Sequence, residues 1–280
     1  MRFVALSFRI AVDAARHFLA DDGWAIASHI ALSTLMALFP FLIVVTALAG
    51  LLFGSKDLAD EAARILLDAW PPEVAGPIAT DISGVLTNSH RSVLTLGVVF
   101  AVYFASSGVE SLRIGLNRAY DMPEWRSWWL LRLESIFYVL VGAIAILAFS
   151  FLVVLAPLIW AQLVRIIPTV QPFDGLVTVA RYTIAVVVLI TALTILHRWL
   201  PAGRRTFREI APGIIATLLL WLISGAIFGS YLAQFAFAYT SMYSGLASAM
   251  IALVFLYVCA SIFIYGGELN AVIKDAKQPR

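Results

Sequence analysis

The chain has 280 residues, of which 62% are hydrophobic and only 13% are charged. A soluble domain of this length needs a smaller apolar fraction for its core, so the composition predicts a membrane protein. The formal net charge of +2 provides no dense basic face for phosphate backbones, and we therefore expect no nucleic-acid partner.

The N-terminal segment has the composition of an amphipathic helix rather than of a cleaved signal peptide. It lacks a continuous apolar run, and no small-residue cleavage site precedes Asp21. We expect residues 1–24 to be retained and to lie in the membrane interface.

Six apolar stretches are long enough to cross a bilayer, which takes about 20 residues at about 1.5 Å each. They run approximately from Ala25 to Gly54, Val93 to Leu112, Leu133 to Trp160, Val179 to Leu200, Ile210 to Leu232 and Gly245 to Leu269. Pro40 in the first stretch removes a backbone donor, which predicts a kink or a tilt. The predicted fold is all-α, a polytopic bundle of about six transmembrane helices in one integral domain over residues 1–280.

The basic residues of the connections predict the orientation, because Lys and Arg near membrane ends are retained in the cytoplasm. Of the 19 Lys and Arg residues, 14 lie in the N-terminal segment, the second and fourth connections and the tail. Both termini are therefore predicted to be cytoplasmic, with residues 270–280 as a cytoplasmic tail.

The first outside connection, residues 55–92, has a helical pattern of its own. Apolar residues recur at helical spacing from Leu58 to Ala69 and again from Val74 to Leu86. We expect two short amphipathic helices that form an outside lid. The lid packs on the bundle or the interface in one interpretation, and it binds a partner or an amphiphile in the other.

The sequence lacks the motifs of common enzyme classes. Its four histidines are far apart, no HxH or HExxH spacing is present, and there is no GxxxxGK[ST] phosphate loop. Nothing places a serine, a base and an orienting acid together. We therefore expect a protein that is not an enzyme, with no catalytic residue, no metal and no cofactor.

Polar residues within the spans are the candidate functional groups, because they are costly against hydrocarbon and tend to face partners or water. Glu110, Arg113 and Asn117 are spaced i, i+3 and i+7, which places an acid, a base and an amide on one helical face. A buried ion pair and a gate that contacts a substrate are the two interpretations. The other members of this candidate groove or gate are His29, Ser33, Pro40, Glu268 and Asn270.

Two further patterns concern packing and lipid contact. Gly225 and Gly229 form a small-xxx-small pair that predicts close helix packing in the fifth stretch. Arg204, Arg205 and Arg208 form a basic cluster that is expected either to contact anionic headgroups or only to set the topology.

With these residues identified, the chain resembles the YihY/BrkB family of bacterial inner-membrane proteins, historically labelled ribonuclease BN-like. The motifs are STLMALFP from Ser33 to Pro40, GLNRAYD from Gly115 to Asp121, Leu200-Pro201, Pro212-Gly213, Tyr243-Ser244-Gly245 and GGELNA from Gly266 to Ala271. The chain departs from the family pattern at His29-Ile30, where an aromatic pair is frequent, and at Ala119-Tyr120. The resemblance implies six helices, an inner-membrane location and a role in envelope integrity or export of lipid-like molecules.

The ribonuclease label does not fit this sequence, because the zinc-dependent tRNA-processing ribonucleases have a histidine-rich motif and a soluble fold. A membrane-bound hydrolase would need a clustered acid and base that the sequence does not show. Two hypotheses follow. One is a transporter or flippase-like protein for an amphiphilic or lipid envelope component, with membrane lipids as partners; the alternative is a non-enzymatic scaffold for envelope-assembly proteins.

Overall fold

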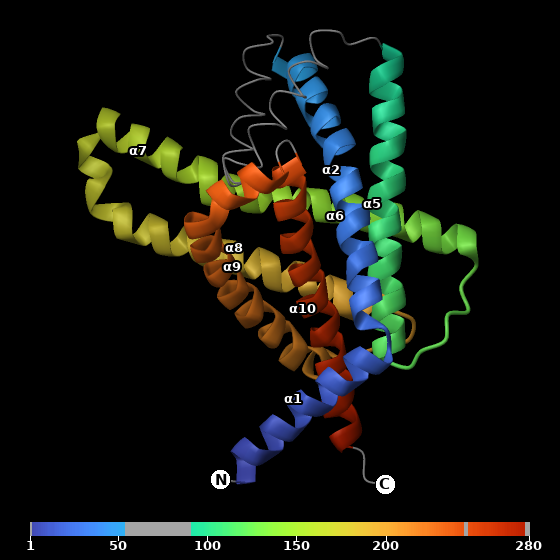
Figure 1. The fold of residues 1–280 in the computed structure, drawn as a ribbon. Helices are drawn as coiled ribbons and strands as arrows, with labels where there is room; N and C mark the ends of the chain where they lie inside the picture. Colours follow the sequence, from blue (N-terminus) through green and yellow to red (C-terminus); the bar gives the residue numbers. More distant parts are fainter. Residues whose placement is uncertain (1, 54–90, 244–245, 278–280) are drawn as a thin grey trace.

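The computed structural model describes residues 2–53, 91–243 and 246–277, which fold into a helical bundle without strands (Figure 1). Residues 54–90, which hold nearly all of the predicted lid, and residues 244–245 of the Tyr243-Ser244-Gly245 motif lie outside the described part. The α-helices are α1 Arg2–Ala20, α2 Gly23–Phe53, α5 Arg91–Ala119, α6 Trp128–Ser150, α7 Ala156–Ile166, α8 Asp174–Trp199, α9 Phe207–Tyr243 and α10 Ala247–Lys277.

Five helical stretches of the described residues are long and apolar enough to cross a membrane. They are Leu96–Ala119, Trp128–Ile166, Pro168–Trp199, Phe207–Gln234 and Ala247–Ala276. The start of α2 adds a shorter apolar helix, Gly23–Leu38, within an element of 31 residues. The prediction of an all-α bundle with about six spans is thereby confirmed. The protein is a multi-pass membrane protein.

The third predicted stretch is longer than its sequence pattern indicated. Helix α6 continues through a π-helical turn, Phe151–Leu155, into α7, so that one helical run covers Trp128–Ile166. Pro157 lies in the first turn of α7, where its missing N–H interrupts the regular i to i−4 ladder. A local π turn can re-satisfy the backbone groups that a proline frees in a membrane helix.

Helices α2, α5 and α10 stand side by side, while α6 with α7 and α8 form a second layer that crosses them (Figure 1). Helices α2 and α5 approach each other closely because Gly108 of α5 has no side chain. A Cβ atom at Gly108 would lie 3.6 Å from the Cβ of Ser33 in α2. Helix α1 packs on α10 at the end of the bundle that holds both termini (Figure 1).

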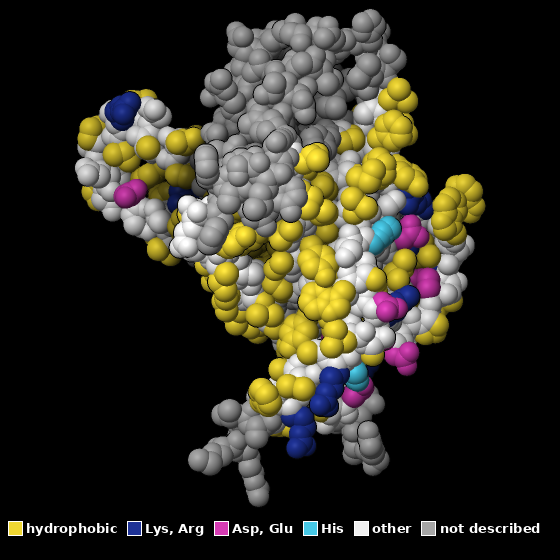
Figure 2. All heavy atoms as spheres, in the orientation of Figure 1, with side chains coloured by type: hydrophobic (Ala, Val, Ile, Leu, Met, Phe, Trp, Pro, Cys, Tyr) yellow, Lys and Arg dark blue, Asp and Glu magenta, His cyan; other side chains and the backbone are white. Residues whose placement is uncertain are grey.

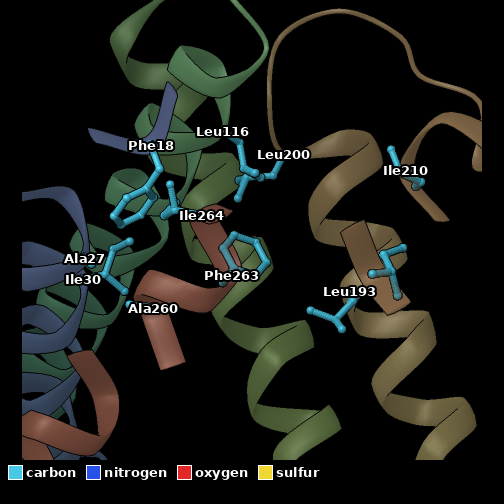
Figure 3. Packing of buried hydrophobic residues seen from close by; sticks show 11 residues of the cluster. Phe18, Ala27, Ile30, Leu116, Leu193, Leu200, Ile210, Ala260, Phe263 and Ile264 are labelled. Atoms are coloured by element: carbon cyan, nitrogen blue, oxygen red, sulfur yellow. The ribbon is translucent and has the colours of Figure 1, made fainter. Parts of the chain in front are cut away.

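The buried apolar cluster holds this end of the bundle together. Its side chains come from α1, α2, α5, α8, α9, α10 and the connection before α9, and many are seen pointing toward one another in Figure 3. Its members are Phe18, Ala27, Ile30, Leu116, Leu193, Leu200, Ile210, Ile214, Ala260, Phe263 and Ile264. The helix ends that flank the connections of residues 120–127 and 200–206 are therefore fixed by close packing.

The close packing predicted at Gly225 and Gly229 is wrong for the described residues. A Cβ atom added at either glycine would meet nothing within 4 Å, and the neighbouring Leu222 and Ile227 are exposed. Hydrophobic side chains also gather over the described middle of the face seen in Figure 2. Such surfaces suit lipid contact, because lipid tails are as apolar as these side chains.

Candidate functional site

Three arginines and three glutamates alternate in one row of ion pairs where α5, α6 and residues 120–127 meet. In order they are Arg132, Glu110, Arg113, Glu124, Arg126 and Glu134, with nitrogen–oxygen distances of 3.1, 3.4, 3.9, 2.8 and 2.7 Å. Their formal charges cancel. This ion-pair row therefore surrounds the buried Arg113 with partly exposed charged groups without leaving a net charge.

Arg113 is the most buried member, with 2% of its side chain exposed. Its Nη1 also donates to the carbonyl of Leu131 and to Ser135 Oγ, both at 3.2 Å. Glu110 and Arg113 form an ion pair in which Arg113 is buried and Glu110 is partly exposed. A gating role for the pair stays a prediction.

Asn117 links the ion-pair row to the connection of residues 200–206. Its Nδ2 donates to Glu124 Oε2 at 3.0 Å, and its Oδ1 accepts from the backbone N–H of Ala202 at 2.7 Å. Two side-chain nitrogens of Arg126 donate to Glu124 and hold the pKa of that carboxyl at about 2. The bonded Glu124 carboxylate in turn raises the pKa of Arg126.

Asn270 occupies a second polar cluster, beside the ion-pair row. Its Oδ1 accepts from the backbone N–H of Gly213 at 2.6 Å, and its Nδ2 donates to Tyr120 Oη at 3.2 Å. That oxygen lies 3.4 Å from Nδ1 of the buried His197. Burial raises the pKa of Tyr120 to about 12. The cluster thus ties α8, α9 and α10 to the connection of residues 120–127.

Glu268 differs from the other candidate residues. It is 1% exposed, and neither carboxylate oxygen has a hydrogen-bond partner among the described residues. Its charged form would therefore be expensive, because buried charges need pairing.

The α2 candidates do not join these clusters. His29 is exposed, with Nδ1 3.4 Å from Ser111 Oγ, while Ser33 is buried against Gly108 of α5. Pro40 lies half-buried inside α2. The structure therefore brings together Glu110, Arg113 and Asn117 but separates them from the α2 residues.

A pocket of about 740 Å³ opens between the start of α6, the end of α8 and residues 200–206, and we call it the arginine pocket. Its lining holds four arginines, two tryptophans and a single carboxylate. The lining residues are Trp125, Arg126, Glu134, Arg198, Trp199, Pro201, Ala202, Gly203, Arg204 and Arg205.

Only part of the basic cluster predicted from the sequence lines this pocket. Arg204 and Arg205 line it, whereas Arg208 is exposed in the first turn of α9 and is not a lining residue. Sequence reasoning missed Arg126 and Arg198. A usable signal was present, because each of these arginines is adjacent to a tryptophan, in Trp125-Arg126 and in Arg198-Trp199.

Arg205 is the buried arginine of the pocket, with 7% of the residue exposed. Its guanidinium lies 3.8 Å from the ring centre of Tyr120, and its Nη1 has no hydrogen-bond partner among the described residues. Burial lowers the pKa of Arg205, although an arginine stays charged at any ordinary pH. Arg205 thus contributes a buried cation to the lining, and one of its enclosed donors has no partner among the described residues.

A second hollow, of about 480 Å³, runs along α6, and we call it the α6 groove. Its lining is apolar apart from Glu134 and the Tyr138 hydroxyl, and Leu133, Phe137 and Leu140 are exposed within it. Glu134 lines both the α6 groove and the arginine pocket. A basic site and an apolar site are therefore adjacent on one surface.

Comparison with known proteins places the chain in a family. The model of the Virulence factor BrkB family matches residues 14–280. The chain belongs to this family. The resemblance inferred from the sequence motifs is thereby confirmed. The family match covers both connections and every described helix from the last turns of α1 onward.

Two relatives are similar over most of this chain. The putative ribonuclease-like protein YfkH of Bacillus subtilis (strain 168) is 26% identical over 92% of this chain and 92% of its own length. The UPF0761 membrane protein RC1_0578 of Rhodospirillum centenum (strain ATCC 51521 / SW) is 26% identical over 95% of this chain, which spans 58% of that relative. No solved structure matches.

Three of the motifs, GLNRAYD, Pro212-Gly213 and GGELNA, contact one another beside the ion-pair row. Gly213 of the Pro212-Gly213 motif and Gly266 of the GGELNA motif pack so closely that a Cβ atom at Gly213 would overlap the carbonyl oxygen of Gly266. Tyr120, from the GLNRAYD motif, contacts Asn270 of GGELNA. Within the described ranges, no group of three or more His, Cys, Asp or Glu residues could hold a metal ion.

Proposed function

We propose that this family member is a transporter or flippase-like protein that binds an amphiphilic or lipid component of the envelope at the arginine pocket and the α6 groove. In this proposal it is not an enzyme. It resides in the inner membrane of a bacterium with both termini in the cytoplasm, so that the arginine pocket faces the cytoplasmic headgroups.

The observation that carries the proposal is the adjacency of the two hollows at Glu134. An amphiphile needs a polar site for its head beside an apolar surface for its chains. The arginine pocket, at about 740 Å³, falls within the size range of small-molecule sites. The α6 groove lies within the apolar run Trp128–Ile166, so a chain placed along it would lie at the depth of lipid tails.

This site differs in place from the groove hypothesised from the sequence. Ser33, Arg113 and Asn117 are buried, so they do not form an open wall in this conformation. The ion-pair row instead supports the arginine pocket, because Arg126 and Glu134 belong to both. Without a phosphate loop for ATP, we propose movement down the substrate's own gradient or with a partner.

Lipid movement can be tested with purified protein in liposomes that contain a lipid labelled on its acyl chain. A membrane-impermeant quencher reports how fast label leaves the inner leaflet. Leu133→Trp should fill the α6 groove and slow the movement, whereas Leu222→Trp, on the open face of α9, should leave it unchanged. Both positions are exposed leucines in membrane-spanning helices, which makes the pair a matched comparison.

If the wild-type protein moves lipid no faster than empty liposomes do, the transport proposal fails. The scaffold alternative would then be favoured by a specific complex with envelope-assembly proteins that Leu133→Trp leaves intact. If both tryptophan variants slow lipid movement equally, the site does not lie in the α6 groove.

A further inference from the structure

The charge of the arginine pocket exceeds what its own carboxylates neutralise. Arg126 is paired with Glu124 and Glu134 at 2.8 and 2.7 Å. Arg198, Arg204 and Arg205 have no carboxylate within ion-pair distance among the described residues. Their three positive charges therefore face a pocket whose single carboxylate is already engaged.

Arg205 is held in this position by the surrounding fold. The connection turns at Gly203, whose φ of +86° is in the left-handed region that favours glycine. A Cβ atom at Gly203 would lie 2.7 Å from Cε of Met122, so the two connections meet here. With Ala202 anchored to Asn117, the turn leaves Arg204 exposed and Arg205 buried over the Tyr120 ring.

We infer that the arginine pocket recognises a phosphate-bearing, net-negative lipid head, with Arg205 and Arg204 as its principal donors and the acyl chains in the α6 groove. This inference rests on the proposed amphiphile function and adds the chemical class of the head. Guanidinium forks match the oxygens of phosphate, and charge-assisted bonds of this kind are about twice as strong as neutral ones.

A phosphate monoester fits the pocket better than a carboxylate head does. Three unpaired guanidinium groups offer more donors than the two oxygens of one carboxylate can accept. A phosphate monoester presents three unbridged oxygens and up to two negative charges, whereas a diester presents two oxygens and one charge. The expected order of affinity is therefore monoester, then diester, then a zwitterionic head whose own cation opposes the arginines.

Trp125 and Trp199 at the rim fit a lipid head rather than a free ion. Both indoles are exposed while lining the arginine pocket. Tryptophan is enriched at the membrane interface, where its ring lies at the level of headgroups. A head bound between them would remain attached to chains that enter the α6 groove at Glu134.

The test measures binding of lipids that share the same acyl chains but differ in their heads. Phosphatidic acid, phosphatidylglycerol and phosphatidylcholine are titrated onto the purified full-length protein, with inorganic phosphate as a separate competitor. The wild type should bind phosphatidic acid about tenfold more tightly than phosphatidylcholine, as expected for one or two charge-assisted bonds. Inorganic phosphate alone should compete weakly, because it cannot fill the groove.

Arg205→Gln should remove most of this preference, and Arg204→Gln should reduce it by about threefold. Arg208→Gln is the matched control, because Arg208 belongs to the same basic cluster but does not line the arginine pocket. Since Arg204 is exposed, its variant should fold even if loss of the buried Arg205 impairs folding.

Equal affinity for the three lipids would overturn the headgroup inference, as would equal losses in the Arg204 and Arg208 variants. If Leu133→Trp still weakens binding of all three lipids in that case, the proposed amphiphile function stands without the phosphate preference. If the protein binds none of the lipids, both proposals fail. Competition by inorganic phosphate as strong as by phosphatidic acid would assign the pocket to a soluble phosphate compound.

Discussion

The backbone N–H of Gly213 donates to Asn270 Oδ1 at 2.6 Å, and this bond joins α9 to α10 where their backbones come closest. Close approach needs glycine on both sides, because a Cβ atom at Gly266 would overlap the hydroxyl of Thr217. Two sequence motifs that are more than fifty residues apart thus form one helix crossing.

Gly213→Ala should destabilise the protein by about 1–3 kcal/mol, the usual cost of overpacking a tight contact. The loss should appear as a lower unfolding temperature in detergent. Gly225→Ala is the matched control in the same helix, where an added Cβ meets no described atom and alanine favours the helix. Equal stability of the two variants would contradict the account of this crossing.

The contrast between these glycines shows how far the sequence could predict the packing. A small-xxx-small pattern marks a helix face that can pack closely, but it does not say whether another helix covers that face. Gly225 and Gly229 have the pattern and remain open, whereas Gly213 has its partner on another helix. Apolar length predicted the helices themselves, since a bilayer imposes it, but not the π turn of Phe151–Leu155.

Only part of the candidate site could be predicted, because sequence spacing indicates contacts within one helix but not contacts between separate segments. Spacing within one helix predicts that Glu110 and Arg113 pair, because residues three apart share a face. It cannot predict Glu124 or Glu134, which reach the ion-pair row from another connection and another helix. The arginine pocket also depends on two connections brought together by the fold, so only its Arg204 and Arg205 were found in advance.

Glu124 should make stability depend on pH in the acid range. Its pKa is about 2 in the folded protein, below the ordinary value of 4.5, because Arg126 donates to the carboxylate. A lowered pKa means that the pair contributes fully above about pH 4.5, and that its contribution is lost as the pH falls toward about 2. Unfolding temperatures measured across this window should fall less steeply in Glu124→Gln than in the wild type. Parallel curves would contradict the pairing.

The ion-pair row predicts that Glu110 and Arg113 depend on each other. Removing the partner of a fully buried charge costs about 3–5 kcal/mol, and the cost is smaller where one member is partly exposed, as Glu110 is. Glu110→Gln and Arg113→Gln should each lower the unfolding temperature and the membrane abundance. The double variant should regain part of both, since the remaining four formal charges again cancel even though Arg132 loses its pairing with Glu110.

Lipid movement by that double variant separates the two interpretations of the pair. If the variant is abundant and moves lipid normally, the pair is structural and the predicted gate is wrong. Abundant protein that moves no lipid would place Glu110 and Arg113 in the working site. Arg118→Gln is a control for loss of an arginine from α5, because Arg118 is exposed and pairs with Asp22 outside the ion-pair row.

The predicted orientation can be tested by cysteine labelling in intact cells. Arg165→Cys, at the end of α7, should react with an impermeant thiol reagent, while Arg208→Cys should react only after the membrane is opened. Both residues are exposed. Gly203 is a poor probe because its φ is positive and Met122 fills the adjacent space. Cys259 should be replaced by alanine first. Labelling of Arg208→Cys in intact cells would reverse the orientation.

Glu268 provides the last prediction, because its burial and its lack of partners point to a group that is kept uncharged or is compensated only in another state. Glu268→Gln preserves the shape and removes the charge, so the variant should be at least as stable as the wild type at neutral pH. Asn270→Ala is the comparison. It breaks bonds to Gly213 and Tyr120 and leaves a buried N–H unsatisfied, at a cost of about 1–3 kcal/mol.

The two variants also test whether Glu268 works in transport, as predicted from the sequence. If Glu268→Gln is stable and moves lipid at the wild-type rate, Glu268 is a packing residue and that prediction fails. If it is stable but inactive, ionisation of Glu268 is part of the transport cycle, because the amide keeps the size and shape of the acid but cannot release a proton or carry the charge. A large loss of stability in Glu268→Gln would instead show that the carboxylate has a partner in the folded protein, contrary to the geometry described above.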